Sequence, residues 1–91
     1  QAEVRQIFRI SKVGTIAGSY MREGEARRKA RARVIRNQKI LVDDAPVSSL
    51  KRVNDDVSEV RTGFEFGVGL DGFNEFEEGD IIEFFVTERV N

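Results

Sequence analysis

Hydrophobic side chains recur at every second position in several parts of the chain, which is the spacing of a β-strand. The clearest run, residues 64–71, alternates apolar residues with glutamate, glycine and aspartate. Shorter runs of the same kind lie around Gln6 and from residue 82. Such strands place one face on a core and the other toward solvent. The pattern predicts that the following side chains share a core-facing side: Val4, Phe8, Ile10, Phe64, Phe66, Val68, Leu70, Ile82, Phe84 and Val86.

Turn-forming residues separate these runs. Glycine, proline, asparagine and other polar residues gather at residues 12–14, 23–25, 37–38, 43–46, 54–56, 71–72 and 77–80. Short strands at this spacing are typical of a small all-β barrel or sandwich. Because no helical segments alternate with the strands, we do not expect a parallel α/β sheet. The chain is predicted to form a single domain over residues 1–91.

One stretch, residues 24–37, fits two structures. It is rich in alanine, arginine and lysine, which are good helix formers, but a helix would carry only a thin apolar stripe of Ala26, Ala30 and Val34. A strand would point small apolar residues inward and cations outward: Ala30, Ala32 and Val34 against Lys29, Arg31 and Arg33. The residue pattern by itself leaves both structures open.

Size and composition narrow the possible classes of protein. A chain of 91 residues without cysteine has no disulfide to stabilise it, so an oxidising compartment is not implied. No apolar run approaches the roughly 20 residues of a membrane helix, and no signal peptide opens the chain. The chain begins with Gln1 rather than methionine, which suggests a piece of a longer protein. We expect a cytoplasmic location.

The net charge of -1 conceals a strong separation of charge along the sequence. Residues 1–42 carry 11 Lys and Arg against 3 Asp and Glu, whereas residues 43–91 carry 4 against 13. Such a chain can present a basic face to a nucleic acid. Alternatively, the two halves pair across a sheet and largely neutralise each other. Both outcomes are open at this point.

Composition also excludes most catalytic chemistry. Without histidine and cysteine there can be no Ser-His-Asp triad, no Cys-His dyad and no ordinary zinc site. Carboxylates could still pair, but a small barrel offers little enclosed space to shift their pKa values. Residues 67–72 match the dinucleotide fingerprint G-x-G-x-x-G, yet no useful helix follows, so the match is accidental. Gly67 and Gly69 instead indicate a bulge or a close approach of a backbone or ligand.

Two groups of cations remain as candidates for RNA binding. The first is the run from Arg27 to Lys39, which holds seven cations and could follow phosphates or be the solvated side of an edge hairpin. The second is the pair Lys51 and Arg52, beside a polar break in an otherwise acidic region. Composition favours a surface ion pair between this second group and Asp55 or Asp56.

Several ordered motifs resemble one protein family. Residues 49–70 read SLKRVNDDVSEVRTGFEFGVGL, with the basic pair, an Asn-Asp-Asp break and then a Phe-Glu-Phe-Gly run. AEVR at residues 2–5, KVGTIAG at residues 12–18 and EGDIIE at residues 78–83 extend the match to nearly the whole chain. These motifs resemble the last domain of bacterial translation initiation factor 2, the part that binds formylmethionyl initiator tRNA.

The resemblance implies a fold. Domains of this family form a closed six-stranded antiparallel β-barrel that is similar to domain II of elongation factor Tu. It also favours the strand over the helix for residues 24–37. The domain would then be the C-terminal part of a larger translational GTPase, with GTP bound outside this chain and no cofactor or metal inside it.

The resemblance also implies a function and a site. The family's domain holds the aminoacyl end of the initiator tRNA and reads the terminal adenosine and the formylated methionine. The matching positions are Ser19, Lys51, Arg52, Val53, Asn54, Glu65, Phe66 and Gly67. The resemblance thereby favours Lys51 and Arg52 as RNA contacts over a surface ion pair. Expected partners are formylmethionyl initiator tRNA, the ribosome and other domains of the parent factor, with no membrane and a monomeric chain.

Some matching positions depart from the family's usual residues. Cysteine is common where this chain has Ser19 and Phe66, and a large residue followed by lysine is common at Val53 and Asn54. Phe66 matters most, because its ring either points into the core or reshapes the pocket. Its alternation with Phe64 and Val68 favours the core.

Two other classes of function remain as alternatives. One is a structural barrel of a related translational GTPase that docks on the ribosome or between domains. The other is an enzyme fragment with a carboxylate site, which the absence of histidine and of a cleft disfavours.

Overall fold

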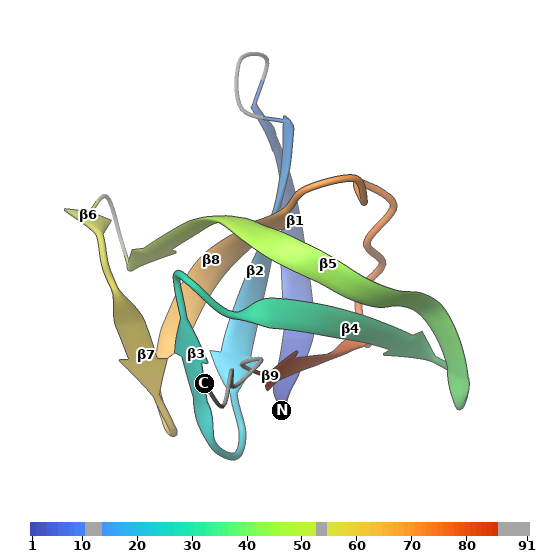
Figure 1. Cartoon of the computed structure of the whole chain (residues 1–91), viewed down its shortest axis with the longest axis horizontal. Helices are drawn as coiled ribbons and strands as arrows, with labels where there is room; N and C mark the ends of the chain where they lie inside the picture. The colour runs from blue at the N-terminus through green and yellow to red at the C-terminus, as the bar shows by residue number, and fades with distance from the viewer. Residues whose placement is uncertain (11–13, 53–54, 86–91) are drawn as a thin grey trace, which may run out of the picture.

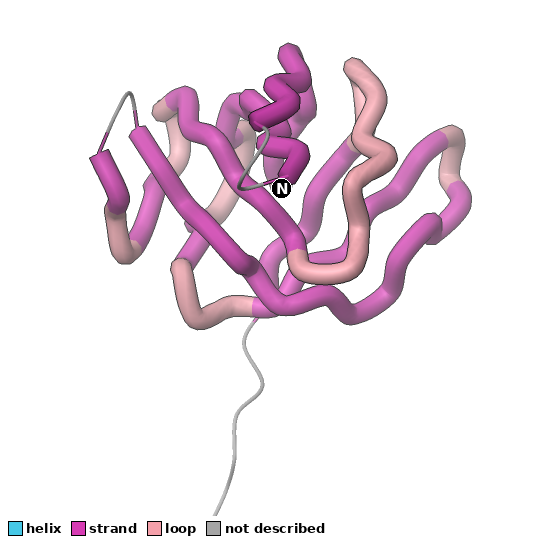
Figure 2. Tube along the Cα trace, turned by 90° about the horizontal axis from the view of Figure 1, so that it is seen from above, coloured by secondary structure: helices cyan, strands magenta, loops and turns pink. Residues whose placement is uncertain are grey.

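The computed structural model describes residues 1–10, 14–52 and 55–85, and within these ranges the chain forms strands and turns without a helix (Figures 1 and 2). The strands are β1 (Ala2–Ile10), β2 (Gly14–Met21), β3 (Glu25–Arg27), β4 (Arg31–Arg36), β5 (Lys39–Arg52), β6 (Asp55–Asp56), β7 (Glu59–Arg61), β8 (Glu65–Leu70) and β9 (Ile81–Phe85). None of the described residues belongs to a helix long and apolar enough to cross a membrane.

Six of these strands close into a barrel. They follow the order β4-β9-β1-β2-β8-β5, all neighbours being antiparallel, and a further pairing of β4 with β5 joins the two ends. The long strand β5 crosses the front of the barrel in Figure 1, while β1, β2 and β8 lie behind it. Strand β6 pairs with the far end of β5, and β3 and β7 form a separate two-stranded ribbon. The predicted all-β, closed six-stranded antiparallel barrel is confirmed.

The inner faces of the strands supply one core. Its members are apolar residues that recur at every second position of the strands, and they include Val4, Ala17, Met21, Ala32, Val34, Leu50, Phe66, Val68, Leu70 and Ile82. Ala26 and Val60, which are opposite each other in the β3–β7 ribbon, are buried in the same cluster. Closure removes the unpaired edges that an open sheet would expose.

Residues 24–37 form strands, as the resemblance predicted. Ala30, Ala32 and Val34 are buried, and β4 pairs with β5 on one side and β9 on the other. Helix propensities differ by only a fraction of a kcal/mol per residue, so two neighbouring strands and a buried face outweigh them.

Phe8 does not point into the core, so this prediction was wrong. A β-bulge between Val4 and Gln6 inserts one extra residue into β1 and reverses the alternation beyond it. Phe8 is consequently 48% exposed, and Ile7 packs against the core instead. The side chain of Ile10 and the whole of Val86 lie outside the described residues.

Phe64 was also predicted to face the core, and this prediction was wrong. Strand β8 begins one residue later, at Glu65, and Phe64 is 43% exposed. Phe66, Val68, Leu70 and Ile82 are buried as predicted, with Phe84 partly buried against them.

A buried ion pair fastens residues 71–80 to β4. Asp80 is 1% exposed, and Arg36 Nε and Nη2 donate to its two carboxylate oxygens at 2.7 and 2.8 Å. The Glu77 backbone N–H also donates to Asp80 at 2.8 Å. The hydrogen bond that Arg36 donates to Asp80 raises the pKa of the Arg36 guanidinium. The buried charge is therefore fully compensated.

The turn between β4 and β5 yields a test of backbone strain. Asn37 and Gln38 have φ angles of 51° and 66°, in the left-handed region that glycine adopts most easily. Asparagine tolerates this conformation because its short side chain can form local hydrogen bonds, whereas the longer glutamine side chain lacks this compensation. We expect Gln38→Gly to raise the free energy of unfolding by about 0.5–1 kcal/mol in urea denaturation.

The matched control is Gln6→Gly, because Gln6 lies in an extended strand. This change should lower stability by about 0.5–1 kcal/mol, since glycine loses more backbone freedom on folding. Equal losses at both positions would contradict the assignment of strain to the turn.

Candidate functional site

An open pocket of about 750 Å³ lies over four neighbouring strands of the barrel, β1, β2, β8 and β5. Its lining residues are Arg5, Gln6, Phe8, Ile16, Gly18, Ser19, Lys51, Glu65, Phe66 and Gly67. Five of them, Ser19, Lys51, Glu65, Phe66 and Gly67, belong to the site that the sequence predicted. The structure thus brings together residues that are up to 48 positions apart, from Ser19 to Gly67.

Glycines form the floor of this pocket. Gly18 is opposite Gly67 across β2 and β8, and Gly67 is opposite Lys51 across β8 and β5. Their neighbours Ala17 and Val68 face the core, so this row lies on the outer face of the barrel. Two adjacent positions without side chains leave the surface hollow between the flanking side chains.

The apolar wall rests directly on these glycine backbones. A Cβ at Gly67 would lie 2.9 Å from Ile16 Cγ2, and one at Gly18 would lie 2.9 Å from Phe8 Cε2. Gly67 is therefore approached closely by a side chain, whereas the sequence predicted a bulge or the approach of a backbone or a ligand. Gly69 lies next to a bulge, but the extra residue is in the partner strand β5, where Gly69 is opposite Ser49.

Charged side chains form the polar part of the pocket. Lys51 and Arg5 contribute cations and Glu65 contributes a carboxylate. The Arg5 guanidinium lies 4.6 Å from the centroid of the Tyr20 ring, and one nitrogen is 3.8 Å from a Glu3 oxygen. Arg5 is the residue at the β1 bulge, which turns it toward the pocket.

Sequence reasoning missed half of the lining: Arg5, Gln6, Phe8, Ile16 and Gly18. The motifs AEVR and KVGTIAG contain three of these residues, but only as markers of the family. Which residues of β1 face outward depends on the bulge, and no feature of the alternation reveals its position.

Ser19 and Phe66 belong to both the core and the pocket. They are directly opposite each other across β2 and β8, and both are buried. The Phe66 ring is 4% exposed, and its centroid lies 6.0 Å from that of Phe84. Ser19 Oγ donates to the Ala17 carbonyl at 3.2 Å. The core interpretation of Phe66 agrees with this burial, although part of the residue borders the pocket.

Lys51 and Arg52 do not share one surface. Lys51 lines the pocket, whereas the Arg52 guanidinium lies 4.2 Å from the centroid of the Phe64 ring. Neighbouring residues of a strand point to opposite sides, which separates the two cations. Within the described part of the chain neither forms an ion pair, although Asp56 and Asp55 are their partners in the β5–β6 register. Val53 and Asn54 lie outside the described residues.

The basic run is largely neutralised by the acidic half of the chain. Arg31 pairs with Asp44, Arg33 with Asp43 at 2.9 Å and Glu83 at 3.3 Å, and Arg36 with Glu77 and Asp80. The hydrogen bond that Arg33 donates to Asp43 raises the pKa of the Arg33 guanidinium. The interpretation that the two halves pair across a sheet therefore holds for the arginines of β4.

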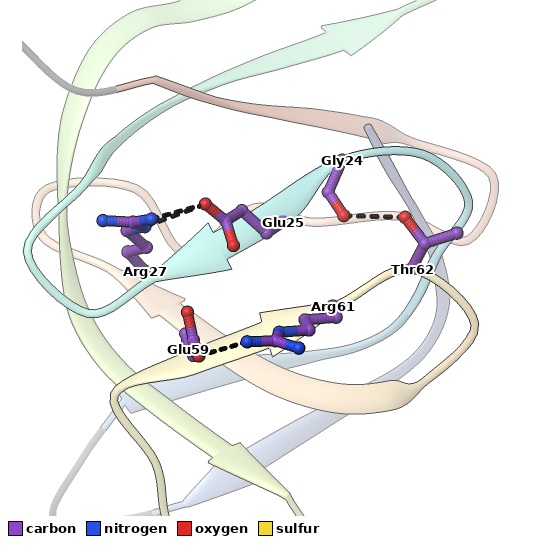
Figure 3. Close-up of polar contacts among 6 residues, drawn as sticks. All are labelled: Gly24, Glu25, Arg27, Glu59, Arg61 and Thr62. Atoms are coloured by element: carbon purple, nitrogen blue, oxygen red, sulfur yellow. Dashed lines mark hydrogen bonds and ion pairs between the residues drawn. The ribbon is translucent and has the colours of Figure 1, made fainter.

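The β3–β7 ribbon compensates its own charges in the same way. Glu25 is opposite Arg61 and Arg27 is opposite Glu59, and each glutamate also pairs within its strand, at 2.7 Å and 3.4 Å (Figure 3). Thr62 Oγ1 donates to the Gly24 carbonyl at 2.8 Å and joins the ends of the ribbon. This surface offers alternating charges rather than a basic patch.

Over residues 1–10, 14–52 and 55–85, no cluster of three or more acidic side chains is arranged to hold a metal ion. The pocket itself presents groups suited to binding. It offers an apolar wall, two cations that can bind phosphate and a carboxylate that can accept hydrogen bonds.

Comparison with known proteins finds relatives over almost the whole chain. Translation initiation factor IF-2 of Syntrophus aciditrophicus is 48% identical over 90 residues, which is 99% of this chain and 10% of that protein. The factors of Rubrobacter xylanophilus and Geobacillus thermodenitrificans are 52% and 50% identical, over 98% and 99% of this chain. The chain spans about 13% and 12% of their lengths. No family model matches the chain.

Phe66 offers a test of how the pocket depends on the core. Replacing a buried phenylalanine with alanine removes its burial and leaves a cavity, so Phe66→Ala should cost about 3–5 kcal/mol in urea denaturation. Phe8→Ala is the control, because Phe8 is exposed and should cost about 1 kcal/mol or less. A Phe66→Ala chain as stable as the Phe8→Ala chain would show that the ring belongs to the pocket alone.

Proposed function

Because the chain belongs to the translation initiation factor 2 family, we propose that it serves translation initiation as a non-enzymatic RNA-binding domain. Its ligand is the formylmethionyl-CCA end of the initiator tRNA. The observation that carries this proposal is the pocket, in which Ser19, Lys51, Glu65, Phe66 and Gly67 lie together.

The polar part of the pocket suits the end of an RNA strand. Lys51 and Arg5 can bind a phosphate through charge-assisted hydrogen bonds. Glu65 can accept hydrogen bonds from a ribose hydroxyl or from the amino group of adenine. The arginines of β4 do not compete for this role, because carboxylates already pair with them.

The apolar part suits the formylated methionine. Phe8 and Ile16 lie against the glycine floor and give the methionine side chain a surface to pack against. Formylation converts the cationic amine into a neutral amide. An unformylated ammonium would lose its hydration and would meet two cations against one carboxylate, which disfavours its binding.

We extend the proposal to the parent protein. This domain would be the C-terminal part of a cytoplasmic translational GTPase, with GTP bound outside the chain and no cofactor within it. One chain would bind one tRNA end, because the pocket is contained in a single copy. The ribosome and other domains of the parent protein are the further partners.

One observation favours a second candidate function, a barrel that docks on the ribosome or on another domain. Ile40 and Leu41, at the tip of the β4–β5 hairpin, are exposed apolar residues. Neither lines the pocket. Such residues are typical of protein contacts when they form a patch.

Titration of the isolated chain with charged initiator tRNA separates these functions. We expect formylmethionyl-tRNA to bind measurably more tightly than unformylated methionyl-tRNA, by filter binding or fluorescence anisotropy at fixed salt concentration. Equal binding of both would contradict recognition of the formyl group. No binding of either would leave the docking function as the better proposal.

Charge reversal of the pocket lysine tests the site directly. Lys51→Glu removes a charge-assisted hydrogen bond worth about 1.5–3 kcal/mol and adds repulsion, so affinity for formylmethionyl-tRNA should fall more than tenfold. The matched control is Lys39→Glu, an equal change of charge at the exposed start of β5. A larger loss from Lys39→Glu would place the RNA on the basic run.

A further inference from the structure

Phe64 is an aromatic residue at the surface that neither the core nor the pocket explains. Phe64 is 43% exposed and does not line the pocket described above. The guanidinium of Arg52 lies 4.2 Å from the centroid of its ring. A guanidinium at this distance from an aromatic face is held by a cation–π interaction.

Backbone hydrogen bonds fix the main chain at Phe64. The Met21 N–H donates to the Phe64 carbonyl at 3.0 Å, and the Gly63 N–H donates to the Met21 carbonyl at 2.8 Å. Phe64 is thereby anchored to the end of β2, one residue before Glu65, which lines the pocket. The main chain that carries the ring is thus tied to β2 beside the pocket.

The Phe64 ring is the contact of the Arg52 guanidinium that the described residues show. Arg52 Nε is shielded from solvent and has no hydrogen-bond partner among the described residues. Nor does Arg52 form an ion pair with any carboxylate in the described ranges. Stacking uses one face of the guanidinium and not the N–H groups of Nη1 and Nη2, which can bind a phosphate.

We propose that Phe64 is a positioning residue that holds the Arg52 guanidinium for a phosphate of the RNA strand. This inference rests on the proposed function. An RNA end bound in the pocket at Lys51 continues past the end of β5, where Arg52 points to the other side of the strand. Arg52 binds the backbone there, and Phe64 lowers the entropy that the long side chain would lose on binding.

Binding measurements with formylmethionyl-tRNA test this role. Ordering one flexible side chain accounts for about two- to tenfold in affinity, so Phe64→Leu should weaken binding by that factor. Phe64→Tyr retains an aromatic ring and should bind like the wild type. Ile40→Ala, at another exposed apolar residue outside the pocket, is the matched control and should bind like the wild type.

The dependence of affinity on salt separates positioning from direct contact. Removing a phosphate contact lowers the slope of log K against log salt by about 0.7 for a single strand. Arg52→Gln should show this reduction, whereas Phe64→Leu should keep the wild-type slope. In the double variant, Phe64→Leu should add no further loss to that of Arg52→Gln.

An RNA-free measurement keeps this inference separate from the proposed function. The ring current of Phe64 should shift the Arg52 Nε–H resonance in the NMR spectrum, and Phe64→Leu should abolish that shift while Phe64→Tyr retains it. Wild-type affinity in Phe64→Leu, or losses that simply add in the double variant, would overturn the positioning role. A wild-type chain that binds no charged tRNA would instead overturn the proposed function, and the positioning role with it.

Discussion

The pairing of β4 with β5 closes the barrel, and the rest of the structure depends on that closure. It forces each of the six strands to bury one face, so small residues such as Ala17, Ala32 and Ala45 are fully enclosed. It also carries the arginines of β4 to the carboxylates Asp43 and Asp44 of β5. A single geometric constraint thereby produces both the core and the neutralisation of the basic run.

The pocket exists because two of the closed strands leave their outer face bare. Gly18 and Gly67 are opposite each other, and the side chains of Phe8 and Ile16 lie against them. Lys51, which forms no ion pair among the described residues, borders this hollow. Apolar surface and positive charge therefore meet at one place on the barrel. The proposed ligand, an RNA end that carries phosphates and an apolar methionine, would need both.

The sequence predicted the fold well because alternation and family motifs agree. Val68 and Ile82 were predicted to lie in the core and are buried, and Lys51, Glu65 and Gly67 were predicted to belong to the site and line the pocket. The prediction failed at Phe8, because one bulge residue reverses which side chains face inward.

The same limit explains the errors at the site. Arg5 reaches the pocket only through that bulge, and Arg52 leaves it because β5 is still extended at its last residue. The ion pairs of Arg31 and Arg33 depend on the register of β4 with β5 and β9, which local composition does not encode.

The most direct test of the proposed site is to map where formylmethionyl initiator tRNA contacts the barrel. Isotope-labelled chain is titrated with formylmethionyl initiator tRNA while the backbone amide resonances are followed by NMR. The account predicts that the amides of Gly18, Lys51 and Gly67 change while those of β4 and of the β3–β7 ribbon do not. Changes concentrated on β4 or on that ribbon, with the glycine floor unaffected, would contradict it.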